Sequence, residues 1–66
     1  MEYKDVVLKL KNQRKFLKIT QKEFSEKIGL SYKIVQKLER AEYDLSILRF
    51  LKICEVLKIN PKDVLE

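Results

Sequence analysis

The sequence predicts a single all-α domain built from five short helices. Apolar residues recur three and four positions apart along most of the chain, which is the spacing of side chains on one face of a helix. Residues that commonly begin helices precede several of these segments, and no linker rich in proline, glycine or serine interrupts them. A chain of 66 residues has room for one small core. We therefore expect residues 1–66 to fold as one unit.

Residues 1–19 are expected to form the first helix. The apolar residues at helical spacing are Tyr3, Val6, Val7, Leu10 and Leu17. Arg14 is an exception to the pattern, because it falls on the same apolar face. Residues 1–20 hold six cations and two anions, so most of the excess positive charge of the chain lies on this helix. Those lysines either form an ordinary solvated face or contact a polyanion.

The segment from Thr20 to Gly29 carries the start and stop signals of a second helix. Thr20 and Glu23 have the spacing of a capping box, in which each side chain accepts a hydrogen bond from the backbone N–H of the other residue. Phe24 and Ile28 lie one turn apart and mark the buried side. Gly29 is the only glycine of the chain. It is expected to end the helix, because glycine adopts the left-handed conformation without a steric penalty.

A third helix is expected over residues 31–40, with Ser31 as its N-cap. At 100° per residue, Val35, Leu38 and Glu39 point to one side. The residues of the opposite side and its flanks are Tyr32, Lys33, Ile34, Gln36, Lys37 and Arg40. This helix therefore has one mainly apolar side, and its other side presents cations and hydrogen-bonding groups.

Two further helices complete the predicted fold. After a short polar connection, Ser46 is expected to cap a fourth helix that runs to about Lys58. The residues expected on its apolar side are Ile47, Phe50, Leu51, Cys54 and Leu57, with Ile53 partly included. Asn60 followed by Pro61 is the start of a short fifth helix.

The composition argues against an enzyme and against a metal or other cofactor. The chain has no histidine and one cysteine, so common transition-metal sites cannot be assembled. No glycine-rich phosphate loop, nucleophile elbow or paired-carboxylate motif is present, and we identify no catalytic residue. Cys54 is expected to be a packed, inert thiol, because no histidine can activate it.

Charge and hydropathy indicate the compartment and the class of partner. The chain lacks an apolar run of the ~20 residues that cross a bilayer, and it opens without a signal-peptide pattern. A single cysteine excludes an internal disulfide, so we expect a cytoplasmic protein. Because no long apolar run is present, we expect no membrane partner. The formal charge of +5 and the pI of about 9.4 favour a polyanionic partner, although a basic surface can also serve solubility alone.

A helix, a turn that contains the only glycine, and a second, basic helix form a helix-turn-helix. Over nearly its whole length the chain resembles the phage repressor and Cro-type (XRE-like) helix-turn-helix DNA-binding family. The matching residues are Arg14, Ile19, Thr20, Gln21, Phe24, Ile28, Gly29, Leu30, Ser31, Val35, Leu38, Glu39, Leu51, Ile53, Leu57, Ile59 and Val64. Ala41 stands where the family usually has glycine, which leaves two outcomes open: a strained helix end or a longer third helix.

The resemblance implies a lambda-repressor-like fold that binds double-stranded DNA through the third helix. The residues that it assigns to base reading are Tyr32, Lys33 and Lys37, with Gln36 as a further candidate. Lysine suits this role because its ammonium donates to N7 and O6 of guanine. The candidate phosphate contacts are Gln21, Arg40, Tyr43 and Ser46, and Lys15 and Lys18 of the first helix. Arg14 and Glu39 are implied to form a structural ion pair between the first and third helices.

A domain of this size reads only a few base pairs, so we expect a homodimer whose third helices lie one DNA turn apart, about 34 Å. The residues proposed for an apolar self-contact are Leu48, Val56, Val64 and Leu65, together with Phe16. Scattered exposed apolar residues are also normal in monomers.

Three functions compete at this point. The first is a sequence-specific transcriptional regulator, most simply a repressor that occupies a promoter. The second is a protein-interaction module with the same fold, such as an antitoxin that binds a toxin. The third is a membrane-surface helix at residues 1–18, which Arg14 disfavours because it lies on the apolar face.

Overall fold

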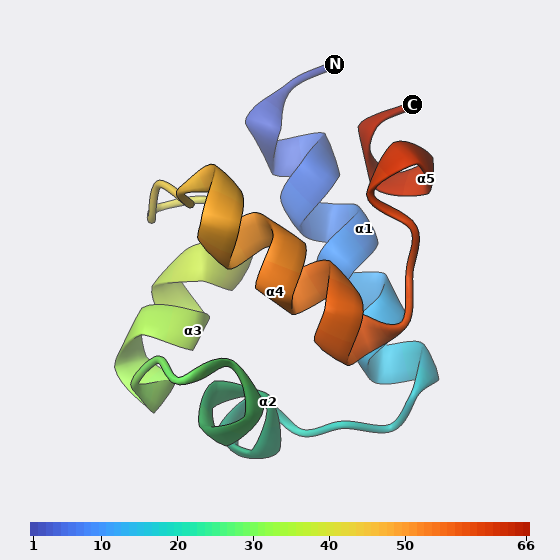
Figure 1. Ribbon diagram of the computed structural model, residues 1–66. Coiled ribbons are helices and arrows are strands. Elements are labelled where there is room, and N and C mark those ends of the chain that lie inside the picture. Colours follow the sequence, from blue (N-terminus) through green and yellow to red (C-terminus); the bar gives the residue numbers. More distant parts are fainter.

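The five helices are α1 (Tyr3–Phe16), α2 (Gln21–Ile28), α3 (Tyr32–Glu39), α4 (Ile47–Leu57) and α5 (Pro61–Leu65). This computed structural model describes all residues from 1 to 66 and contains no strand. In Figure 1, α3 forms the left edge of the molecule, α2 lies below it, and α4 runs across the front. Both chain ends lie at the top of the same view. The Lys9 ammonium of α1 donates to the Glu66 carbonyl at the C-terminus. The predicted all-α class with five helices is confirmed.

Local side-chain caps explain where four of the helices begin. The predicted capping box of α2 is present: Thr20 Oγ1 accepts from the Glu23 N–H at 3.1 Å, and Glu23 Oε1 accepts from the Thr20 N–H at 3.0 Å. These hydrogen bonds, the backbone one above all, hold the pKa of the exposed Glu23 carboxyl below its ordinary value. The side-chain oxygens of Ser31, Ser46 and Asn60 cap α3, α4 and α5 by accepting from a backbone N–H of the first turn. Short-range sequence signals therefore fix these boundaries.

The helix C-termini differ from one another in the residue that occupies the left-handed position. Gly29 follows α2 with a φ of 73°, as the sequence predicts. At the ends of α1, α3 and α4 the left-handed residues are Lys18 (φ 59°), Ala41 (φ 59°) and Lys58 (φ 55°). The next N–H returns to the last turn each time, for example from Glu42 to the Lys37 carbonyl at 2.9 Å. Ala41 therefore ends α3 in a strained conformation and does not extend it. α1 also ends earlier than expected, at Phe16.

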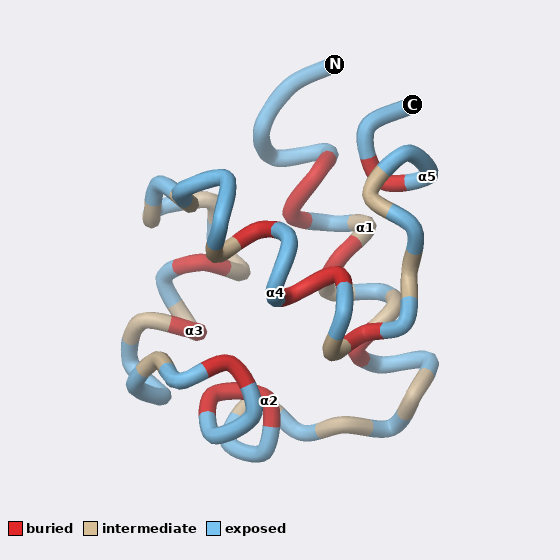
Figure 2. The backbone as a smooth tube through the Cα atoms, viewed as in Figure 1, coloured by how far each residue is buried: buried red, intermediate tan, exposed pale blue.

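All five helices contribute to one core. Its twelve apolar members are Val6, Val7, Leu10, Phe24, Ile28, Val35, Leu38, Phe50, Ile53, Cys54, Leu57 and Val64. In Figure 2 the buried segments of the helices face a shared interior, and the connections between helices are mostly exposed. Burial raises the pKa of the Cys54 thiol above its ordinary value.

The apolar face expected for α4 is partly wrong. Ile53 is completely buried, whereas Ile47 is 65% exposed and Leu51 is also exposed. The reason is the rotation of α4 about its axis: it covers α1 and α2 with the side that carries Phe50, Ile53 and Leu57. Ile47 and Leu51 lie beyond the edge of that contact. The sequence shows that both sides are apolar but not which of them has a partner.

The predicted self-contact also needs correction. Val64 cannot take part in it, because its side chain is completely buried in the core of its own domain. Val56 is half-buried and packs against that core. Leu48 and Leu65 remain exposed, as does Phe16 at the end of α1. None of the five helices combines the length and apolarity that a membrane crossing requires.

Candidate nucleic-acid interface

The helix-turn-helix is formed by α2 and α3, which pack against each other across the turn at Gly29. Val35 and Leu38 bury the inner side of α3 almost completely. Leu30, in the turn, is half-buried and packs against the core. Ser31 begins α3 immediately after the turn, and its hydroxyl oxygen accepts from the Ile34 N–H at 3.2 Å. α3 is thus held at its start and along one side, and its other side faces solvent.

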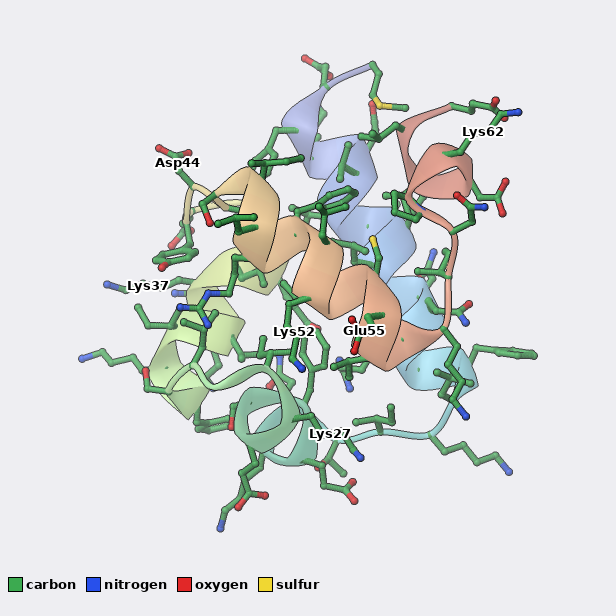
Figure 3. The ribbon with its side chains drawn as sticks, in the orientation of Figure 1. Lys27, Lys37, Asp44, Lys52, Glu55 and Lys62 are labelled. Carbon is green, nitrogen blue, oxygen red and sulfur yellow. The ribbon has the colours of Figure 1, made fainter.

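The residues predicted to read bases lie on or beside that outer side. Lys33 and Lys37 are exposed, and neither ammonium has a carboxylate within ion-pair distance. Figure 3 shows Lys37 pointing from α3 away from the domain. Tyr32 is exposed at the first turn, and Gln36 is half-buried at the border of the buried side. The outer side of α3 therefore offers unpaired cations beside a phenol and an amide.

Arg14 and Glu39 form a bidentate ion pair between α1 and α3. Arg14 Nε lies 2.7 Å from Glu39 Oε2, and Arg14 Nη2 lies 3.1 Å from Glu39 Oε1. The exposed fractions of the two side chains are 8% and 6%. Arg14 Nη1 also donates to the Ile19 carbonyl at 2.6 Å, which ties the end of α1 to the α1–α2 connection. The pair fixes how α3 is oriented on α1.

Gln21 joins this pair, a contact that the sequence analysis missed. Its amide Nε2 donates to Glu39 Oε1 at 2.9 Å, so Arg14, Gln21 and Glu39 connect α1, α2 and α3. Every buried side-chain nitrogen and oxygen of the protein has a hydrogen-bond partner. The second amide hydrogen and the amide oxygen of Gln21 stay available. A polar residue one position after an N-cap gives no signal that it will bond across the fold.

The other predicted phosphate contacts flank α3 on two sides. Lys15 and Lys18, on the side of α1, are exposed. Arg40 is exposed at the end of α3, and its Nε lies 3.3 Å from Glu42 Oε1. On the side of α4, the backbone carbonyl of Tyr43 accepts from the Tyr3 hydroxyl. The pKa of the Tyr3 hydroxyl is raised, and the largest cause is its burial.

Ser46 lies at the start of α4, where its hydroxyl oxygen accepts from the Arg49 N–H at 3.1 Å. Sequence analysis did not single out Arg49, whose Nη1 donates to the Ile28 carbonyl at 3.0 Å and so ties α4 to the end of α2. Ser46, Arg49 and Lys52 surround a hollow of about 350 Å³, and Leu48 completes its wall. This flank therefore combines a helix N-terminus with two cations.

A second, apolar groove lies between the N-terminal parts of α1 and α4 and the fifth helix. Its volume is about 240 Å³, and its lining residues are Tyr3, Val6, Leu45, Ser46, Ile47, Phe50 and Leu65. Its apolar character differs sharply from the charged surroundings of α3. The groove shares Ser46 with the α4 flank, so the two surfaces are neighbours.

Comparison with known proteins agrees with this geometry. The helix-turn-helix family matches residues 10–64, which include all of α2, α3 and α4. No curated protein and no solved structure gives a significant match. Because the family match covers most of the chain and includes the two helices and the turn described above, the chain belongs to the Cro-type helix-turn-helix family of DNA-binding regulators.

Proposed function

We propose that this protein is a sequence-specific transcriptional repressor that inserts α3 into the major groove of DNA and acts as a homodimer. The observation that carries the proposal is the contrast across α3, where Val35 and Leu38 are buried and Lys33 and Lys37 are exposed without partners. A rigid helix with unpaired donors on its free side fits the width of the major groove. Occupation of a promoter would exclude polymerase.

Base reading is assigned to four residues of α3. Lys33 and Lys37 lie about one turn apart and can donate to N7 and O6 of guanine in neighbouring base pairs. Tyr32 stands at the entry of the helix, where its hydroxyl reaches a base edge or a phosphate. Gln36 can bond adenine through its amide, and its half-buried position restricts its reach. We expect Lys33 and Lys37 to carry most of the sequence preference.

Phosphate contacts are assigned to the residues around α3. The free amide hydrogen of Gln21 and the N-terminus of α2 suit one phosphate. Arg40, Lys15 and Lys18 add positive charge on the same side, and Tyr43 and Ser46 stand on the other. Such contacts set the register of the protein on DNA without reading its sequence.

The homodimer is proposed to form through the apolar surface beside the α4 flank. Ile47, Leu48 and Leu65 are the exposed aliphatic residues of that region. Val64 cannot take part because it is completely buried, and Val56 is half-buried against the core, so at most part of its side chain is available. A second copy is the occupant that a two-fold symmetric operator requires, and the groove directly adjoins the proposed DNA surface. Ile47→Glu should shift the protein towards monomer in sedimentation analysis.

Selection of bound DNA from a random pool tests the function directly. We expect a palindromic consensus whose half-sites lie about one helical turn apart, since a two-fold dimer reads two equal sites. A consensus with a single half-site would contradict the proposed homodimer but would still support sequence-specific DNA binding. Recovery of no consensus, together with binding that is independent of sequence, would overturn the proposed repressor.

A protein-interaction module such as an antitoxin is the second candidate. Ile47, Leu48 and Leu51 are all exposed on α4, which is more apolar surface than DNA contact needs. Glu42 and Asp44 also place negative charge in the α3–α4 connection, next to the proposed DNA surface. A gel shift at about 150 mM salt separates the two candidates. Absence of a sequence-dependent shift under these conditions would favour the interaction module.

A further inference from the structure

Cations also lie beside the end of α3, on the side of α1. A cleft of about 360 Å³ separates the first half of α1 from the end of α3. Its lining residues are Lys4, Asp5, Val7, Leu8, Lys11, Glu39, Arg40 and Ala41. The α3–α4 connection next to the cleft contains Glu42 and Asp44, and Glu42 Oε1 lies 3.3 Å from the Nε of Arg40.

The carboxylates of the cleft do not cancel its cations. Glu39 accepts hydrogen bonds from Nε and Nη2 of Arg14, which does not itself line the cleft. Asp5 lies in the first turn of α1 and accepts from the Glu2 N–H at 3.3 Å, next to the positive end of the helix. Lys4 lies 3.4 Å from Glu2, but both side chains are about 70% exposed, so this pair is weak. Arg40 lies 3.3 Å from Glu42, and this pair is weak for the same reason, because both side chains are more than half exposed. Lys4, Lys11 and Arg40 therefore stay available to a polyanion.

The lysines of the cleft continue along α1 as a stripe. Lys4, Lys11 and Lys15 are spaced so that, together with Leu8, they share one side of the helix. From Lys4 to Lys15 the helix rises about 16 Å, which is the axial length of about five phosphates on one DNA strand. The stripe ends next to Arg14, and Gln21 and Arg40 lie on the α3 side of it. It therefore belongs to α1 and passes beside the end of α3.

We propose that Lys4 and Lys11, in line with Lys15 and Arg40, hold the sugar–phosphate backbone of the DNA strand that passes along the α1 side of α3. The proposal rests on the DNA-binding function and adds to it a row of backbone contacts along α1, besides those assigned to the α4 flank. Contacts of this kind raise affinity for every sequence and leave the base preference to α3.

The slope of log K against log salt concentration tests the stripe, because each neutralised phosphate contributes about 0.9 to it. The variant is Lys4→Gln/Lys11→Gln, measured on the selected operator and on a scrambled DNA. Its matched control is Lys58→Gln/Lys62→Gln, which removes the same charge at the end of α4 and on α5. Figure 3 shows Lys62 on the side of the view opposite Lys37. We expect the slope to fall by about 1.8 in the variant and to stay nearly constant in the control.

Further measurements separate this inference from the function on which it rests. A stripe that binds phosphates predicts equal losses of affinity on operator and scrambled DNA, and Lys11→Arg should keep the slope. Equal slopes in the variant and its control would overturn the stripe, and Lys37→Ala would still weaken operator binding if the repressor proposal holds. If the wild-type protein shows no salt-dependent DNA binding at all, both proposals fail together. Thermal unfolding of each variant confirms that the fold is intact.

Discussion

The charged residues at the inner end of α3 and on its outer side have opposite surroundings. At the inner end, the Glu39 carboxylate is almost inaccessible and accepts hydrogen bonds from Arg14 and Gln21. On the outer side, Lys33 and Lys37 are exposed and have no carboxylate partner. The same short helix therefore carries one charge that the domain satisfies completely and two that it leaves free. We infer that the first serves orientation and that the second serves a ligand.

Desolvation explains why the buried carboxylate needs hydrogen-bond donors and the exposed lysines do not. A buried carboxylate is tolerated only when nearby donors replace the water that it has lost, and here three N–H groups do so. An exposed lysine keeps its water and stabilises the fold very little, so the fold gives no reason for two cations on one side of α3. Substitutions should therefore affect stability at the inner end and DNA affinity on the outer side.

The largest effect is expected from Arg14→Met. The variant leaves Glu39 buried without its main partner, which should lower the free energy of unfolding by about 3–5 kcal/mol. Urea denaturation followed by circular dichroism measures this loss. The double variant Arg14→Met/Glu39→Met should recover much of it, because an apolar pair has no unsatisfied charge. A single variant as stable as the wild type would contradict the structural role of the pair.

Next in size is the effect of Lys37→Ala on DNA binding. The variant should weaken binding to the selected operator by about 1–3 kcal/mol and relax the preference at one base pair, since it removes the proposed base contact. Its unfolding free energy should stay within about 0.5 kcal/mol of the wild type, as is usual for an exposed side chain. Competition titrations with operators changed one base pair at a time measure the preference. An equal loss of affinity for all sequences would indicate that Lys37 contacts a phosphate and not a base.

Gln21→Ala should combine both behaviours on a smaller scale. Loss of its hydrogen bond to Glu39 should reduce the unfolding free energy by about 1 kcal/mol. Loss of its proposed phosphate contact should weaken binding to operator and scrambled DNA about equally. Paired measurements of stability and affinity on this variant therefore show whether the residue belongs to the inner network alone. An unchanged affinity on both DNAs would assign it to that network.

Sequence reasoning succeeded where the signal is local. The capping box of Thr20, the caps Ser31 and Ser46, and the left-handed Gly29 each depend on residues within four positions, so the pattern determines the geometry. The inward side of α3 followed from helical periodicity in the same way.

The remaining features depend on how the helices pack. The rotation of α4 decided that Ile53 is buried and Ile47 exposed, although both are apolar residues of one helix. Arg49 bonds the end of α2, and Gln13 Nε2 donates to the Leu57 carbonyl at 2.9 Å, across contacts with no periodic signature. Val64 is buried because α5 packs on α1, a contact between the two ends of the chain that the sequence pattern does not reveal. Such contacts follow from tertiary placement, which short motifs do not encode.

The smallest effect is expected at Ala41, the residue that ends α3. Ala41 adopts a φ of 59°, a conformation that disfavours residues with a Cβ by about 1–2 kcal/mol. Ala41→Gly removes that strain but makes the unfolded chain more flexible, which takes back about 0.4–1 kcal/mol. The net result should be a gain of about 0.5–1 kcal/mol in unfolding free energy, measured by urea denaturation.

Gly29→Ala is the matched control for that gain, because Gly29 has a φ of 73° and occupies the corresponding position after α2. A Cβ at Gly29 would meet only Arg49 Nη1, at 3.8 Å, so the expected loss of similar size comes from backbone conformation and not from a clash. The operator preference of Ala41→Gly should equal that of the wild type, since neither the inner ion pair nor the outer lysines change. A preference that shifts in Ala41→Gly would mean that the end of α3, and not only its charges, decides how the helix is presented to DNA.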